Sequence, residues 1–151
     1  MGLGFLAGLA ATYVMDVVTE LLYTEHIAQR ERELQSQPST HVIAQKILSN
    51  LELDPVKKDI EKIGPLLHWA LGASSGIVGG VLAQESAAPA GMAVATGMFL
   101  FDEVGLSLLG AAPPSSSYPW QTNLRSLLGH AAYGFTFAMA FEALRALSPQ
   151  G

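Results

Sequence analysis

Six ionisable side chains of this sequence lie inside or at the edge of long apolar stretches, where an isolated charge is costly. They are Asp16, Glu20, His68, Asp102, Glu103 and His130. Imidazole and carboxylate groups can pair with each other, exchange protons near neutral pH once desolvated, or bind a transition metal. These residues therefore allow three kinds of chemistry: polar pairing between helices, a proton or ion path, and a metal site.

A metal site has the weakest support of the three. Its candidate ligands are His68, His130, Asp16 and Asp102, since imidazoles and carboxylates suit zinc, iron or manganese. No apolar stretch contains a His-x-x-x-His or Glu-x-x-His pair, and the chain has no cysteine to supply a thiolate. We therefore predict no cofactor.

Four stretches are long and apolar enough to form helices that cross a bilayer, which takes about 20 residues. They cover residues 3–23, 65–83, 89–111 and 126–147. Their apolar character is continuous rather than alternating, which favours helices over strands. The segment 72–83 has no charged side chain to form the polar stripe of a soluble bundle. We predict a single all-α domain, a four-transmembrane-helix bundle whose partner is the lipid bilayer.

A polar insert, residues 24–64, separates the first two spans. Ser39-Thr40 can cap a short helix within it, and Asp54-Pro55 is typical of an N-cap followed by proline in the first helical turn. Gly64-Pro65 is expected to mark the entry to the second span. The insert is too short for a core of its own, so we predict a helical hairpin at the membrane surface.

The positive charges are distributed unevenly and predict the orientation. The insert holds six of the eight basic residues, and Arg125 borders the loop on the same side of the predicted bundle. Only Arg145 lies on the other side. By the positive-inside rule the insert is cytoplasmic and both termini are periplasmic, in a bacterial inner membrane.

This topology gives the six ionisable residues a similar depth. All fall within roughly 15 Å of the cytoplasmic boundary at a helical rise of 1.5 Å per residue. An ionised acid in the hydrocarbon region costs roughly 2.5 kcal/mol or more, so the groups should face one another or water. We predict that His68 and His130 meet Asp16 and Asp102 in one polar intramembrane cluster. Glu20 and Glu103 are expected to lie nearer water.

Glycines recur at four-residue spacing on two of the spans. Gly72, Gly76 and Gly80 share one face of the second span, and Gly4 and Gly8 share one face of the first. Faces of small residues let helices approach closely in a membrane. They predict close helix packing, either within the chain or in a homo-oligomer or larger membrane complex.

The loop before the last span is the most distinctive passage. It contains Pro113-Pro114, which is expected to end the third helix, and the aromatic residues Tyr118 and Trp120, which suit the headgroup region as anchors. With Gly110 before it and Gly129-His130 after it, residues 90–142 resemble the YagU-like family of bacterial inner-membrane proteins. The resemblance implies a helical membrane fold but no settled activity. Asp102 stands where that family would have a histidine.

The sequence leaves three functions open. The first is a small multi-pass inner-membrane protein, not an enzyme, that handles protons or ions or acts in a stress response. The second is a membrane metalloenzyme that uses the same cluster, and the third is an accessory subunit that packs through its glycine faces. Nucleic acid is not an expected partner, because the net charge is −5 and there is no basic patch.

Overall fold

The computed structural model describes residues 2–53, 57–83 and 85–148, and in these ranges the chain is helical and contains no strand. The predicted all-α class is therefore confirmed. The helices are α1 (Gly2–Leu21), α2 (Glu25–Leu34), α3 (Ser39–Asn50), α4 (Lys57–Leu82), α5 (Ala87–Leu100), α6 (Leu106–Leu108) and α7 (Trp120–Leu147). A π-helical turn, Phe101–Gly105, joins α5 to α6, and a 3₁₀ turn, Ser115–Ser117, lies in the loop before α7.

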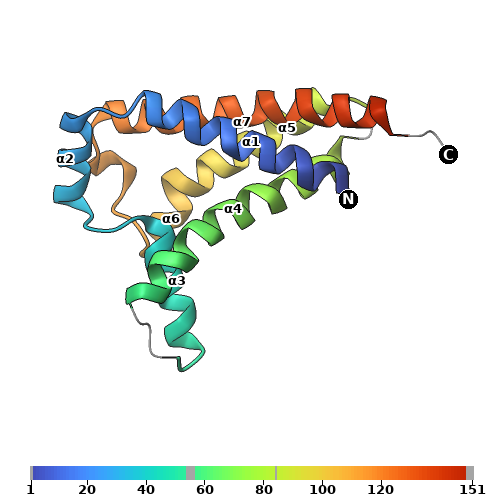
Figure 1. Ribbon diagram of the computed structural model, residues 1–151. Coiled ribbons are helices and arrows are strands. Elements are labelled where there is room, and N and C mark those ends of the chain that lie inside the picture. The colour runs from blue at the N-terminus through green and yellow to red at the C-terminus, as the bar shows by residue number, and fades with distance from the viewer. Residues whose placement is uncertain (1, 54–56, 84, 149–151) are drawn as a thin grey trace.

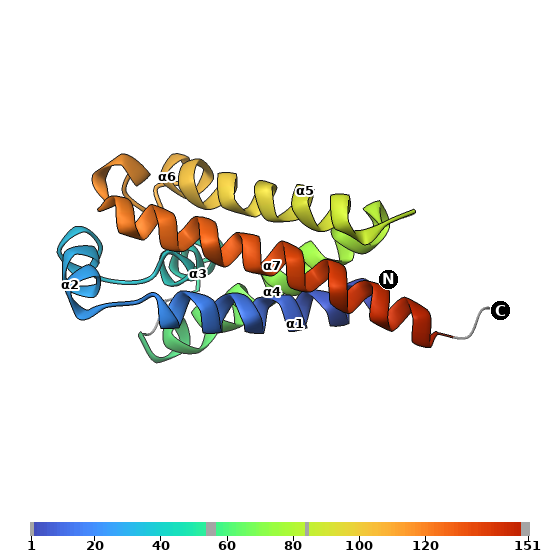
Figure 2. The same cartoon turned by 90° about the horizontal axis from the view of Figure 1, so that it is seen from above.

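The four long helices run alongside one another (Figures 1 and 2). α1 packs on α4 and α7, and α5 packs on α7. α4 diverges from α5 toward the end of the bundle that carries α2 and α3, which we call the insert end (Figure 1). The first turn of α1 and the last turn of α7 lie at the opposite end of the bundle.

Three helical stretches are long and apolar enough to cross a membrane: Gly2–Leu21, Asp59–Leu82 and Ala87–Leu108. They correspond to the first three predicted spans. α7 has 28 residues, but Arg125, His130 and Glu142 interrupt its apolar character. Large side chains on these helices, such as Phe135 and Met139 of α7, are exposed in the isolated chain.

Glycines make the contact between α1 and α4. A Cβ atom on Gly8 would lie 2.9 Å from both the Gly72 carbonyl oxygen and the Gly76 Cα atom. A Cβ atom on Gly80 would lie 3.1 Å from the Cα atom of Gly4. The two backbones touch because no side chain separates them. The glycine faces are therefore occupied within the chain.

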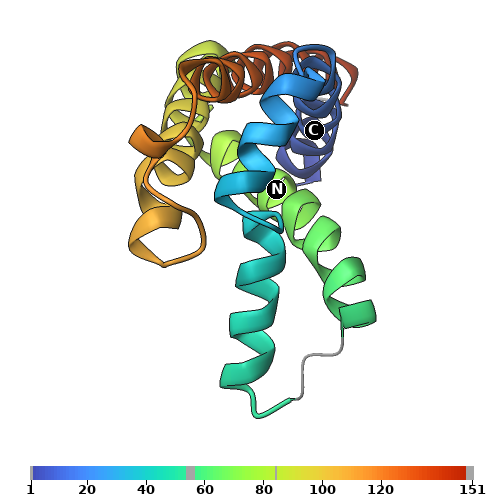
Figure 3. The same cartoon turned by 90° about the vertical axis from the view of Figure 1, so that its left-hand side faces the viewer.

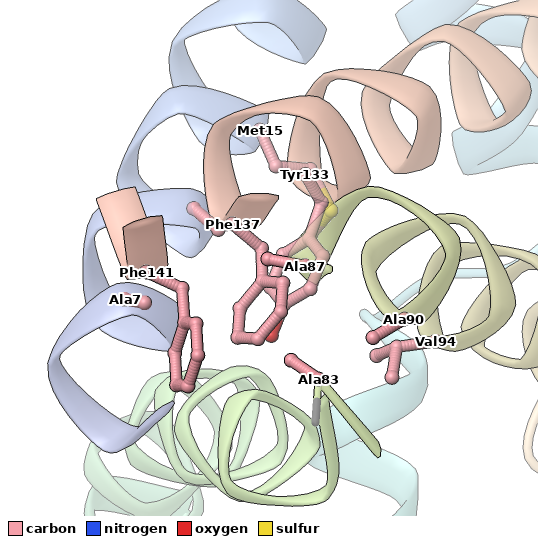
Figure 4. Close-up of a cluster of buried hydrophobic side chains, with 10 residues drawn as sticks. Ala7, Met15, Ala83, Ala87, Ala90, Val94, Tyr133, Phe137 and Phe141 are labelled. Carbon is pink, nitrogen blue, oxygen red and sulfur yellow. The ribbon is translucent and has the colours of Figure 1, made fainter. Parts of the chain in front are cut away.

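Aromatic side chains of α7 fill the centre of the bundle (Figure 4). Tyr133 and Phe137 are fully buried, and Phe141 stacks on Phe137 with ring centroids 5.6 Å apart. The Tyr133 hydroxyl donates a hydrogen bond of 2.7 Å to the Gly72 carbonyl. Small residues on the facing helices, such as Ala87, leave the space that these rings occupy.

Several predicted helix boundaries are wrong. α4 begins at Lys57 and continues through Pro65, so Gly64-Pro65 lies inside a continuous helix. The third long helix ends before Pro113-Pro114, where Gly110 adopts a positive φ of 61° that glycine allows. α7 begins at Trp120, six residues before the predicted start. Ser39 is the first residue of α3 and not its cap, and the predicted cap at 54–55 lies outside the described residues.

The insert contains one helix that the sequence patterns did not predict. α2 begins after Thr24, whose side chain caps it, and lies across the insert end of the bundle (Figures 1 and 3). It buries Ile27 and Ala28. α3 packs on the first turns of α4, where the half-buried His41 ring occupies the space beside Gly64.

Candidate functional site

The first polar pair joins α1 to α4. His68 Nε2 lies 2.8 Å from Asp16 Oδ1, and both side chains are more than one third exposed. A neutral imidazole with its hydrogen on Nε2 satisfies this contact by donating to the carboxylate. The pair therefore needs no additional proton.

The second pair joins the π turn to α7. His130 Nε2 lies 3.4 Å from Asp102 Oδ2, and His130 Nδ1 lies 2.8 Å from the Ser126 carbonyl oxygen. A carbonyl only accepts, so Nδ1 must carry a hydrogen, and a neutral imidazole then presents a lone pair at Nε2. Two acceptors face each other until one further proton binds. One further proton between these two atoms would turn the contact into a hydrogen bond.

The surroundings of the second pair are asymmetric. The His130 side chain is only 6% exposed, and its ring meets Phe99 edge-on with centroids 5.9 Å apart. The Asp102 side chain is 46% exposed. Asp102 is therefore the more open member of the pair in the isolated chain, and His130 is the member that the bundle shields.

The π turn bears on how Asp102 is placed. Its closing hydrogen bond runs from the Leu106 amide to the Phe101 carbonyl. Such a turn holds one residue more than an α-helical turn, so it changes the helix face that the following residues occupy, and π turns are frequent at functional sites. The sequence patterns gave no indication of this turn.

Two cavities meet at Asp102. A polar cavity of about 410 Å³ lies beneath α2 and is lined by Glu31, Glu103, Tyr118 and Asn123 among others. A second cavity, of about 820 Å³, runs between α4 and α5 and is lined by His68 and His130. Asp102 and Arg125 line both cavities. Asp102 therefore connects the polar space at the insert end to the interior of the bundle.

Four of the six predicted members form these two pairs, and His68, Asp102 and His130 line the same cavity, while the other two members join neither pair. Glu20 is exposed near the end of α1. Glu103 lines the polar cavity beneath α2, and its backbone carbonyl accepts a hydrogen bond from Ser115.

The two predicted anchors have different surroundings. Trp120 is 68% exposed at the start of α7. The Tyr118 hydroxyl instead donates a hydrogen bond of 2.6 Å to the Gln35 side chain, which in turn donates to the Ala111 carbonyl. Burial and then the charge of Glu31 raise the pKa of Tyr118, so its phenol remains a donor across the physiological range.

Arg125 holds α2 against the bundle. Its guanidinium donates to Glu31 at 2.7 Å, with both side chains largely buried, and lies 4.2 Å from the centroid of the Tyr23 ring. The contact links α7 to α2 across 94 residues of sequence. An arginine beside an apolar span requires a counter-charge, but the sequence does not indicate which acid supplies it.

We expect Arg125→Ala to detach α2 from the end of the bundle. The change leaves Glu31 partly buried without its partner, at a cost of roughly 2 kcal/mol. Amide hydrogen exchange in α2 should therefore accelerate by a factor of ten or more, measured by mass spectrometry. The matched control is Arg30→Ala, because Arg30 pairs with Glu33 at an exposed site where such pairs contribute roughly 0–1 kcal/mol. Equal exchange in the two variants would contradict this role for Arg125.

Within the described residues, no three His, Asp or Glu side chains are arranged to hold a metal ion. His68, His130, Asp16 and Asp102 form two pairs rather than one set of ligands. Comparison of the chain with protein-family models, curated proteins and solved structures finds no match.

Proposed function

We propose that this chain is a four-span membrane protein that carries protons through the His130–Asp102 pair. The observation that supports this most directly is the state of His130, whose Nδ1 is committed to the Ser126 carbonyl while its Nε2 faces a carboxylate. One proton shared between these groups can pass from the more exposed Asp102 to the shielded His130 and back. The cavities on either side of Asp102 supply the approach.

The membrane placement in this proposal takes α7 as the fourth span. α7 packs along α1 and α5, and its outward side chains Phe135 and Met139 are apolar and exposed. The excess of basic residues at the insert end supports a cytoplasmic insert and periplasmic termini. The resemblance to YagU-like proteins supports the bacterial inner membrane as the location.

We expect opposite labelling of cysteines placed at the two ends of the bundle. The chain has no cysteine of its own, so single-cysteine variants need no further change. Ser49→Cys on α3 should be protected from a membrane-impermeant maleimide in intact cells and react after lysis. Glu85→Cys, in the loop between α4 and α5, should react in intact cells. The reverse pattern would invert the proposed orientation.

Proton flux into vesicles tests the function itself. Purified protein is reconstituted into liposomes that enclose a pH-sensitive dye, and a pH gradient is imposed with potassium and valinomycin to balance charge. Vesicles with the parent protein should equilibrate faster than empty vesicles. Asp102→Asn should slow the protein-dependent rate by roughly a hundredfold, because a positioned proton-transfer group typically contributes that much.

Glu20→Gln is the matched control, since it also replaces an acid by its amide near the insert end but at an exposed position outside both pairs. It should retain the parent rate. A parent protein that conducts no faster than empty vesicles would refute proton transport. A parent rate that survives Asp102→Asn would refute the assignment to this pair.

A further inference from the structure

The cavity between α4 and α5 has two chemically different parts. Along its length it is apolar, with Leu71, Val78 and Leu82 on α4 and Met98 and Phe101 on the opposite side. Its insert end is polar and carries His68, Asp102, Arg125 and His130. Leu82 lies fourteen positions after His68 on α4, which corresponds to roughly 21 Å of helix. A ligand that fits this shape has an apolar body and one polar end.

The apolar part of the cavity is open rather than filled by the chain's own side chains. Leu71, Val78, Leu82 and Phe101 are each 42–54% exposed. Gly97 also lines the cavity, and a Cβ atom built on it would meet no atom within 4 Å. Space of this kind along apolar walls favours an apolar occupant.

The charges at the polar end of the cavity favour a ligand with a positive charge over one with a negative charge. Among the described residues that line this end, Asp102 is paired with His130, whereas Arg125 is neutralised by Glu31. With a neutral imidazole beside it, the Asp102 carboxylate leaves a formal charge of −1, so an anionic group would be repelled.

We propose that this cavity binds a lipophilic cation, an amine or onium group on an apolar body, whose charge pairs with the Asp102 carboxylate. The inference rests on the proposed proton site, because cation and proton compete for the same carboxylate. The other charged or titratable groups around Asp102 are His130 and Arg125 of α7, His68 of α4, Glu103 beside it, and Glu31 and Arg32 of α2. Each cation that binds to the Asp102 carboxylate displaces one proton from it.

Tetraphenylphosphonium is the probe, and tetraphenylborate is its match in shape with the opposite charge. Calorimetry on the purified protein in mild detergent should show saturable binding of the cation and none of the anion. The affinity for tetraphenylphosphonium should fall as the pH falls. In the range where one proton competes with one cation for Asp102, the decrease should be roughly tenfold per pH unit. Asp102→Asn should weaken binding at least tenfold and remove its pH dependence.

Blocking the cavity gives an independent test. Gly97→Trp places an indole in the open space and should abolish binding, while Ala70→Trp, at an exposed position of α4 outside the cavity, should leave it unchanged. Cation binding that survives both Asp102→Asn and Gly97→Trp, or equal uptake of the anion, would overturn the proposal. Absence of cation binding in a protein that still shows Asp102-dependent proton flux would overturn this inference alone. It would leave the proposed function intact.

Discussion

Gly76→Leu is expected to destabilise the folded state of this protein strongly. A Cβ atom on Gly76 would lie 2.5 Å from Gly8 Cα and 2.8 Å from Gly8 N, and closer still to the Gly4 carbonyl oxygen. These are backbone atoms, which cannot rotate away as a side chain can, so α1 and α4 must separate. Overpacking of a closed contact costs roughly 1–3 kcal/mol and occasionally more, and we expect the upper part of that range.

The measurement is thermal unfolding in mild detergent, followed by circular dichroism and by elution volume in gel filtration. Gly97→Leu is the matched control, because the same substitution there meets open space and should leave the unfolding temperature close to that of the parent. Displacement of α4 would also break the hydrogen bond from the Tyr133 hydroxyl of α7 to the Gly72 carbonyl of α4. The near-ultraviolet circular dichroism should therefore change in Gly76→Leu and not in Gly97→Leu. Equal stability of the two variants would show that α1 and α4 do not meet through their glycines.

This contact could be anticipated in part from the sequence. Four-residue spacing of Gly72, Gly76 and Gly80 indicates a close-packing face, because the helical period places these residues on one side. It does not indicate which helix covers the face. The structure assigns it to α1 of the same chain through Gly4 and Gly8, so an accessory-subunit role would require a different surface.

The long helices were predicted because an apolar run of sufficient length has few other structures available in a membrane. The helix α2 was not predicted, because its sequence is mostly polar and its position depends on tertiary contacts. Glu31 meets Arg125 across 94 residues, and Gln35 meets Tyr118 across 83. No local pattern contains such partners.

The candidate site, like the fold, could be predicted only in part from the sequence. The cost of charge in an apolar span identifies which residues need partners, and His68, Asp16, His130 and Asp102 do find them. The pairing itself depends on geometry that the sequence does not display. Asp102 lies within the π turn Phe101–Gly105, which no local pattern indicates, and the Ser126 carbonyl determines which nitrogen of His130 carries a hydrogen.

His130→Leu is expected to eliminate proton transfer and to lower stability as well. Leucine keeps an apolar contact with Phe99 but cannot hold a proton for Asp102, so Asp102-dependent flux should fall to the level of empty vesicles. The variant also loses the hydrogen bond to Ser126 and leaves Asp102 without its partner, at a cost of roughly 1–3 kcal/mol. Flux in vesicles and unfolding in detergent measure the two effects separately.

A double-mutant cycle distinguishes a specific pair from general damage to the bundle. If His130 and Asp102 act together, His130→Leu combined with Asp102→Leu should destabilise the protein less than the two single effects added, by roughly 0.5–3 kcal/mol. His130→Gln separates structure from function, because an amide can donate to Asp102 but cannot exchange a proton at neutral pH. It should recover much of the stability that leucine loses and none of the flux. Additive single effects, or a glutamine variant that conducts like the parent, would show that the shared proton is not what these residues provide.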